Sequence, residues 1–305
     1  MANETTPHPV TLSAVTPSAI ENQEDAAQVR AAVDGDRAAL EQLVQKHQRF
    51  IYALAQRMLY SPADAADATQ EILVRVITHL ASFRGDSALR TWIYRIAVRH
   101  LLSVRKGRVE HVVTSFECFG NALDETPNLD LPDAQSVPVD VQLIVEEAKV
   151  GCLMAMLLCL DREHRMAFVL GEIFEASDTV MAEVLEISRD NARQRLRRAR
   201  QQLRAFLTGR CGLVHPEGSC RCAKKTAGFI QQGIVDPKRL QFTAIHLDRT
   251  REASAAGSRA LAGYVEEAYA KLLRTQPVAD AADFSEILRE LLQRPEVRRT
   301  LAAGN

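Results

Sequence analysis

Apolar residues recur at three- and four-residue spacing over most of this 305-residue chain, and this periodicity is what most limits its fold. Such spacing places apolar side chains on one face of an α-helix, whereas a half-buried strand requires strict alternation. Two long stretches carry the helical pattern, residues 24–106 and residues 141–207. No stretch of any length alternates as a strand does. We therefore predict an all-α protein.

Shifts in composition divide the chain further. The segments, in order, are a flexible tail (1–24), an N-terminal helical domain (25–107), an acidic linker (108–139), a helix–turn–helix domain (140–208) and a helical C-terminal extension that contains cysteines (209–305). The linker is placed where periodicity fades and prolines appear among acidic residues. Within the extension, helical patterning resumes at about 258–275 and 283–293. The prediction is two small helical domains joined by a linker and followed by an extension.

The formal net charge of −1, from 38 basic and 39 acidic residues, conceals a strong order of charges. Residues 84–108 carry a net +6, residues 110–147 a net −9 and residues 189–210 a net +7. A single block of like charge is ordinarily a solvated face. Two Arg-rich blocks, each on an amphipathic helix, instead favour surfaces that bind the phosphates of a nucleic acid.

Several classes of protein fit poorly. The N-terminus has no Lys or Arg before Arg30 and no apolar run, unlike a signal peptide. The longest uncharged apolar run, residues 150–160, is too short to span a bilayer. Gly-rich phosphate loops, a nucleophile elbow and a His-Glu-x-x-His zinc motif are absent from the sequence. We therefore expect a soluble, cytoplasmic protein that inserts in no membrane and is not an enzyme.

Residues 178–196 have the features of a DNA-reading helix–turn–helix. Ala182 is small where the two helices would cross, and Ser188 can cap the second helix by accepting a backbone N–H bond. Glu186 stands in the turn, where a left-handed conformation would cost on the order of 1 kcal/mol. The second helix presents residue types that contact base edges and phosphates in a major groove. These candidates are Ser188, Arg189, Asn191, Arg193, Gln194, Arg197 and Arg198.

Motifs in the first domain make the pattern more specific. Asp67, Gln70 and Glu71 share one helical face, which alone would be an ordinary surface. Further on, the chain reads Phe-Arg-Gly at 83–85 and Leu-Arg-Thr-Trp-Ile-Tyr-Arg-Ile-Ala at 89–97. With these motifs, about residues 30–106 and 140–208 resemble bacterial sigma factors of the sigma-70 family, in particular the extracytoplasmic-function (ECF) group.

The resemblance implies a transcription initiation factor that binds core RNA polymerase and directs it to promoters through their −10 and −35 elements. Its implied partners are core RNA polymerase, double-stranded promoter DNA and the melted −10 strand, and an anti-sigma factor is a candidate partner. No cofactor is required. The second helix of the helix–turn–helix would read the −35 element. The implied polymerase-binding residues are Asp64, Asp67, Gln70 and Glu71, and the implied −10 residues are Arg90, Trp92, Tyr94, Arg95, Arg99 and Arg105.

Two questions stay open at this level. Trp92 and Tyr94 could stack on unpaired bases, each stack being worth about 1–3 kcal/mol, or could belong to the core. The chain could also be an independent helix–turn–helix regulator with a sensory N-terminal domain. Charge reversal on the face of Asp67 and Glu71 separates the two functions, because only a sigma factor loses polymerase binding.

The start of the extension holds a cluster of thiols. Cys211, Cys220 and Cys222, together with His215, supply four ligands that could form a tetrahedral zinc site. The Cys-x-Cys spacing is tighter than the common Cys-x-x-Cys, so a redox-sensing thiol group and a structural loop remain alternatives. The amphipathic helices beyond it predict a small regulatory domain that modulates access to promoter or polymerase.

Overall fold

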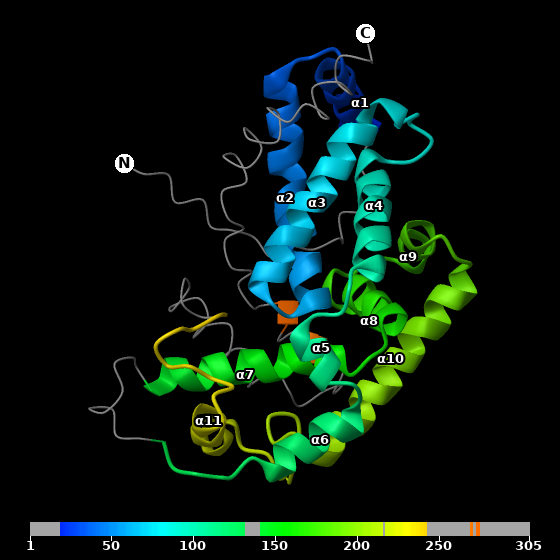
Figure 1. The fold of residues 1–305 in the computed structure, drawn as a ribbon. Helices are drawn as coiled ribbons and strands as arrows, with labels where there is room; N and C mark the ends of the chain where they lie inside the picture. Colours follow the sequence, from blue (N-terminus) through cyan, green and yellow to red (C-terminus); the bar gives the residue numbers. More distant parts are fainter. Residues whose placement is uncertain (1–18, 132–140, 216, 243–268, 271–272, 275–305) are drawn as a thin grey trace.

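The computed structural model describes residues 19–131, 141–215, 217–242, 269–270 and 273–274, of which residues 19–22 are described by backbone only (Figure 1). These residues form helices and no strand, apart from one isolated bridge between Cys211 and Cys220. The predicted all-α class is confirmed. The helical stretches expected at about 258–275 and 283–293 lie outside the described residues, except for 269–270 and 273–274, which are helical.

The first four helices form the N-terminal bundle. They are α1 (Ala19–Val33), α2 (Arg37–Leu59), α3 (Pro62–His79) and α4 (Leu89–Ser103). Asp36 caps α2 by accepting bonds from two backbone amides, and Ser61 caps α3, with Pro62 at the first helical position. Helix α1 begins within the segment expected to be a tail. It packs on α2, where the side chain of Asp25 pairs with Lys46.

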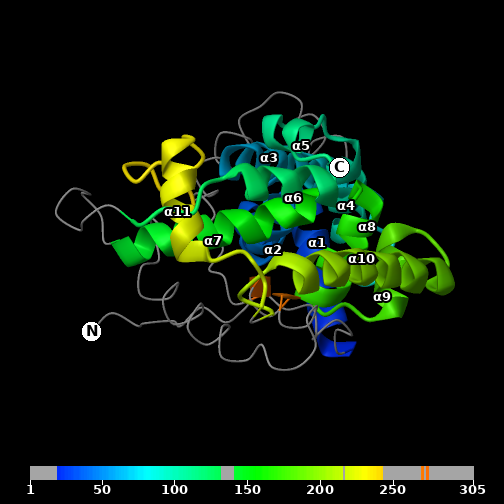
Figure 2. The same ribbon diagram turned by 90° about the horizontal axis from the view of Figure 1, so that it is seen from below.

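The second group of helices carries the helix–turn–helix. It consists of α7 (Val141–Leu158), α8 (Arg162–Phe168), the π-helical turn η3 (Val169–Ile173), α9 (Asp178–Leu185) and α10 (Arg189–Arg210). Helix α11 (Cys222–Gln231) follows and crosses α7 (Figure 2). Gly171 in η3 allows a close approach of the chain, because a Cβ there would lie 2.8 Å from Leu196 and 2.9 Å from Met181.

The acidic segment contains two short helices, α5 (Arg108–Val112) and α6 (Phe116–Glu125). Helix α6 packs on the end of α10, with the rings of Phe116 and Phe206 5.2 Å apart. Arg210 pairs with Asp124, and the Lys225 ammonium donates to the carbonyl oxygen of Leu123 at 2.6 Å. The described part of the acidic segment, residues 108–131, is therefore docked on the second group of helices and on the extension.

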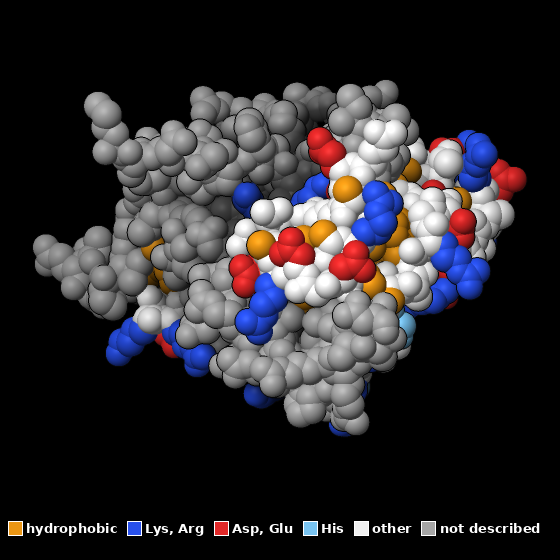
Figure 3. Space-filling view, turned by 90° about the horizontal axis from the view of Figure 1, so that it is seen from above, with side chains coloured by type: hydrophobic (Ala, Val, Ile, Leu, Met, Phe, Trp, Pro, Cys, Tyr) orange, Lys and Arg blue, Asp and Glu red, His pale blue; other side chains and the backbone are white. Residues whose placement is uncertain are grey.

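The two groups of helices share one continuous hydrophobic core. The ring of Phe50 in α2 lies 4.7 Å from that of Phe174, which follows η3. Helix α4 lies alongside α9 (Figure 1). At the far end of the bundle, seen in Figure 3, acidic and basic side chains are interspersed over the described surface. None of the described helices is long and apolar enough to cross a membrane.

Candidate nucleic-acid interface

Helices α9 and α10 form the predicted helix–turn–helix. Ser188 caps α10 by accepting a hydrogen bond from the backbone amide of Asn191 at 3.2 Å. Glu186 in the turn is left-handed, with φ of 55°, which costs a non-glycine residue about 1–2 kcal/mol. Ala182 and Ala192 are buried. The predicted cap, the strained turn and the small buried residue at the helix crossing are confirmed.

The outer face of α10 is strongly basic. Its exposed predicted residues are Ser188, Arg189, Arg193, Gln194, Arg197 and Arg198. Asn191 is half-buried. Arg193 donates from Nε to Asp178 of α9 at 2.7 Å, and this hydrogen bond lowers the pKa of Asp178. The N-terminal half of α10 thus presents guanidinium and amide donors on a helix, which is the arrangement that a major groove accepts.

The basic side chains of α4 face the helix–turn–helix. Arg99 forms a two-pronged ion pair with Glu186, in which its Nε and Nη2 lie 2.7 and 2.6 Å from the two carboxylate oxygens. Arg95 lies 3.5 Å from Glu183 and also donates to the Ser87 hydroxyl at 2.8 Å. In this structure Arg95 and Arg99 are therefore paired with α9 and its turn.

The two aromatic candidates differ in accessibility. Tyr94 is 4% exposed and stacks on Phe50 with ring centroids 3.8 Å apart, and burial raises the pKa of its hydroxyl well above the usual range. Its ring cannot stack on a base in this conformation. Trp92 is half-buried and meets Phe83 edge-on at 5.7 Å. Arg90 is half-buried and Arg105 is exposed, so the predicted −10 residues do not form one open surface.

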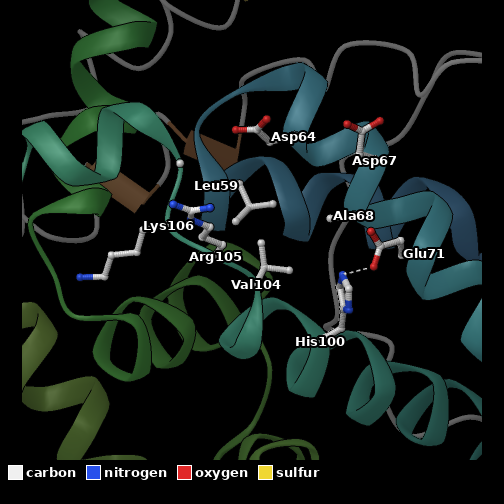
Figure 4. A pocket seen from close by; sticks show the side chains of 10 residues that line it. Leu59, Asp64, Asp67, Ala68, Glu71, His100, Val104, Arg105 and Lys106 are labelled. Carbon is white, nitrogen blue, oxygen red and sulfur yellow. Dashed lines mark ion pairs between the residues drawn. The ribbon is translucent and has the colours of Figure 1, made fainter.

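The acidic face of α3 borders a pocket of about 260 Å³ (Figure 4). Its charged lining residues are Asp64, Asp67 and Glu71 from α3 and Arg105 and Lys106 from the segment after α4. Gln70, the fourth predicted polymerase-binding residue, does not line it. The structure thus gathers three carboxylates on one concave surface and places two cations on its other rim.

His100 lies in this pocket and was not singled out by the sequence. Its Nε2 lies 3.7 Å from Glu71 Oε2, and neither ring nitrogen has a hydrogen-bond partner among the described residues. Burial lowers the pKa of His100, although the charge of Glu71 acts in the opposite direction. Buried polar atoms are ordinarily hydrogen-bonded, so the two ring nitrogens of His100 are an exception, with Glu71 as their nearest charged neighbour.

The cysteine cluster is not gathered around a common point in the described part of the chain. Among the described residues, no three His, Cys, Asp or Glu side chains gather so that they could hold a metal ion. Cys211, Cys220 and Cys222 are free thiols, and His215 is exposed. Burial raises the pKa of all three thiols, that of Cys222 to about 12. A reactive thiol needs a lowered pKa, so the structure supports neither the zinc nor the redox hypothesis.

Three further residues join the two groups of helices. Glu110 of α5 is buried and accepts bonds from Arg162 at 2.7 Å and from Arg165 at 3.0 Å. Arg165 also donates to the carbonyl oxygen of Met58 in α2 at 2.6 Å. The sequence carried no clear signal for this cluster. Glu110 is one of nine acidic residues in residues 110–147, and nothing in its neighbours marks it as the buried one.

Fold and surface together define a helical DNA-binding protein with a helix–turn–helix. The protein-family model described as Sigma-70 region 2 matches residues 43–108 of this chain. The chain is 30% identical over 178 residues to the ECF RNA polymerase sigma-E factor of Escherichia coli, covering 55% of this chain and 86% of that one. It is 27% identical over 174 residues to the RNA polymerase sigma-H factor of Pseudomonas aeruginosa (55% and 86%) and 28% identical over 172 residues to the RNA polymerase sigma factor YlaC of Bacillus subtilis (56% and 94%).

The chain belongs to the ECF group of the sigma-70 family. Members of this family are transcription initiation factors that act with core RNA polymerase at promoters, and they need no cofactor. The relatives do not favour the alternative of an independent helix–turn–helix regulator.

Proposed function

We propose that α10 reads the −35 element of the promoters that this sigma factor selects. The supporting observation is the capped N-terminal half of α10, from which Arg189, Gln194 and Arg197 project into solvent. Arginine and glutamine make two-point contacts with guanine and adenine edges in the major groove. Arg193, Arg197 and Arg198 supply phosphate contacts that orient the helix, which leaves Arg189 and Gln194 to read base edges.

Helix α4 reads the −10 element in this proposal. Arg95 and Arg99 become available for the phosphates of the melted strand once they leave Glu183 and Glu186. Trp92, which is half-buried, is the better placed of the two aromatic residues to stack on an unpaired base. Arg90, near the start of α4, and Arg105, just after its end, supply further positive charge.

The pocket beside α3 is the docking surface for core RNA polymerase. Asp64, Asp67 and Glu71 supply negative charge at its rim, and His100 of α4 faces Glu71 across the pocket. This surface fits a partner helix that carries basic and polar side chains. Gln70 extends the surface outside the pocket.

The protein acts by binding and carries out no catalysis, and we place it in the cytoplasm, where polymerase and promoter DNA are found. An anti-sigma factor that covers the α3 face or α10 is a further candidate partner. With the segment boundaries proposed from the sequence, the N-terminal helical domain (25–107) corresponds to sigma region 2 and the helix–turn–helix domain (140–208) to sigma region 4. The extension comprises residues 209–305.

Charge reversal of the pocket rim tests the proposal. In transcription in vitro with core polymerase, Asp67→Lys with Glu71→Lys should abolish both polymerase binding and promoter-specific initiation. Glu24→Lys with Asp34→Lys, an equal double reversal at exposed acids in and just after α1, should leave both unchanged. Normal polymerase binding by the pocket variant would contradict the proposed surface. Promoter-specific DNA binding without any polymerase binding by the unaltered protein would favour the independent regulator.

A further inference from the structure

The helix proposed to read the −10 element, α4, packs against the helix–turn–helix that is proposed to read the −35 element. Helix α4 packs against α9. The guanidinium of Arg99 donates from Nε and Nη2 to the two carboxylate oxygens of Glu186, at 2.7 and 2.6 Å. Arg95 approaches Glu183 at 3.5 Å on the same seam. Two of the four arginines that would hold the −10 strand, Arg95 and Arg99, are thus paired with carboxylates of the helix–turn–helix.

This packing is incompatible with simultaneous reading of both promoter elements. The names of the elements place their centres about 25 base pairs apart, which is about 85 Å at about 3.4 Å per base pair. Packed helix axes lie only about 8–10 Å apart. Promoter engagement therefore requires α4 and α9 to separate, an argument that rests on the proposed function.

The C-terminal extension ties the two groups of helices together at a second place. Tyr269 is fully buried, donates its hydroxyl to the carbonyl oxygen of Leu153 in α7 at 2.6 Å, and has its ring 5.8 Å from that of Phe168 in α8. The carbonyl oxygen of Leu273 accepts a bond from Arg57 of α2 at 2.8 Å. The short described part of the extension thus contacts both groups of helices.

Arg274 fastens the same segment to the entrance of the helix–turn–helix. Its Nε donates to the carbonyl oxygen of Glu172 in η3 at 2.6 Å, and its Nη1 pairs with the carboxylate of Glu175 at 2.8 Å. Glu175 lies in the connection between η3 and α9 and has a left-handed backbone, with φ of 56°. The segment therefore contacts the chain immediately before α9, the helix that covers α4.

We propose that this chain carries its own inhibitor: Tyr269, Leu273 and Arg274 form a clamp that holds the two groups of helices in a closed state that cannot engage a promoter. Helix α4 packs on α9, and the Arg99–Glu186 pair lies at the exposed edge of that contact, with side chains 68% and 41% exposed. The clamp holds together the two groups of helices on which this contact depends. The apparent affinity of a protein for its target falls with the fraction of molecules in the competent state. Breaking the clamp should therefore raise promoter affinity without any new DNA contact.

Hydrogen exchange of the isolated full-length protein tests closure without polymerase. Tyr269→Ala combined with Arg274→Ala should raise exchange in peptides from α4 and α9, whereas Lys238→Ala, an exposed basic residue of the same extension, should not. With core polymerase, the double variant should give at least about five-fold tighter promoter binding and correspondingly more transcript at limiting protein.

If the Tyr269→Ala substitution unfolds the chain, a second variant, altered only at the surface, still tests the proposal. Glu186→Gln removes the partner of Arg99 without touching the core and should act in the same direction, with Glu117→Gln on α6 as its control. Unchanged exchange and unchanged promoter affinity in every folded variant would overturn the clamp. Increased exchange with unchanged affinity would show that closure does not inhibit, and would overturn it too. If no protein, the unaltered one included, binds polymerase, the proposed function is refuted. Hydrogen exchange in α4 and α9 then still shows whether the clamp closes the two groups of helices.

Discussion

Arg165 of α8 and Glu110 of α5 form a buried ion pair, with Nη2 and Oε1 3.0 Å apart and the two side chains 1% and 3% exposed. Arg162 binds the other carboxylate oxygen at 2.7 Å. One carboxylate thus balances two guanidinium groups between the N-terminal bundle and the helix–turn–helix unit. Removing one partner of such a cluster leaves buried charge uncompensated.

Glu110→Gln should accordingly destabilise the protein by about 3–5 kcal/mol, because the buried Arg165 and the partly buried Arg162 lose their counter-charge. Urea unfolding followed by circular dichroism measures this change. Glu117→Gln, at an exposed carboxylate of α6, should change the free energy of unfolding by less than about 0.5 kcal/mol. Equal effects of the two substitutions would show that the ion-pair cluster does not stabilise the fold.

The same carboxylate gives the stability a dependence on pH. Burial by itself would raise the pKa of Glu110, but the hydrogen bond from Arg162 and the charge of Arg165 outweigh it, and the pKa lies below the usual range. The folded state therefore binds the proton less tightly than the unfolded chain. The stabilisation is complete above the unfolded pKa of about 4.3 and is lost as the pH falls through the folded value. Thermal unfolding from pH 7 to pH 3 should show this loss, and Glu110→Gln should reduce it.

Arg197 should contact DNA phosphate, whereas Arg195 on the same helix should not. Arg195 is half-buried and pairs with Glu163 at 2.9 Å, while Arg197 is exposed. In equilibrium binding to a −35 duplex at several salt concentrations, Arg197→Ala should reduce the slope of log K against log salt by about 0.9. Arg195→Ala should leave the slope unchanged. Equal slopes for the two variants would place the DNA on another face of α10.

Ser188→Ala should destabilise the protein by about 0.5–2 kcal/mol, because the amide of Asn191 loses its acceptor at the start of α10. Ser188→Asn restores an acceptor at the same position and should recover most of that stability. Thermal unfolding of the two variants checks this. A Ser188→Ala protein as stable as the unaltered one would show that solvent caps the helix equally well.

Cys222 should resist alkylation at neutral pH. Burial raises the pKa of its thiol to about 12, and the thiolate is the reactive species. Iodoacetamide at pH 7.5 should therefore modify Cys222 in the folded protein at least ten-fold more slowly than in urea, as followed by peptide mass spectrometry. Rapid modification in the folded state would revive the redox hypothesis for this loop.

Local signals predicted the helix–turn–helix well. Ser188 caps its helix, Ala192 is buried and Glu186 is left-handed, because each of these features depends on residues within one or two turns. The start of α3 at Pro62 follows from the same kind of signal. The start of α1 at Ala19 does not, because its packing on α2 comes from a partner that is distant in sequence.

The candidate DNA surface of the first domain was harder to predict. Tyr94 and Trp92 stand two residues apart in a basic helix. Tyr94 is nevertheless buried against Phe50, while the side chain of Trp92 remains partly exposed to solvent. Helical periodicity gives a face to each side chain but does not say which faces a second group of helices will cover. The residues of the seam, Glu183 and Glu186, looked like ordinary surface acids for this reason.

By itself the sequence determined the helices, their caps and the order of charge along the chain, since these depend on neighbours within a few residues. Only the tertiary structure decided where the opposite charges meet. Arg99 belongs to a block of net +6, and in the folded chain it is paired with Glu186, 87 positions away. Ion pairs form between groups that packing brings within a few ångströms, and such pairs depend on long-range contacts that no local pattern encodes. Whether the basic helix α4 is open to DNA is therefore set by its packing on α9.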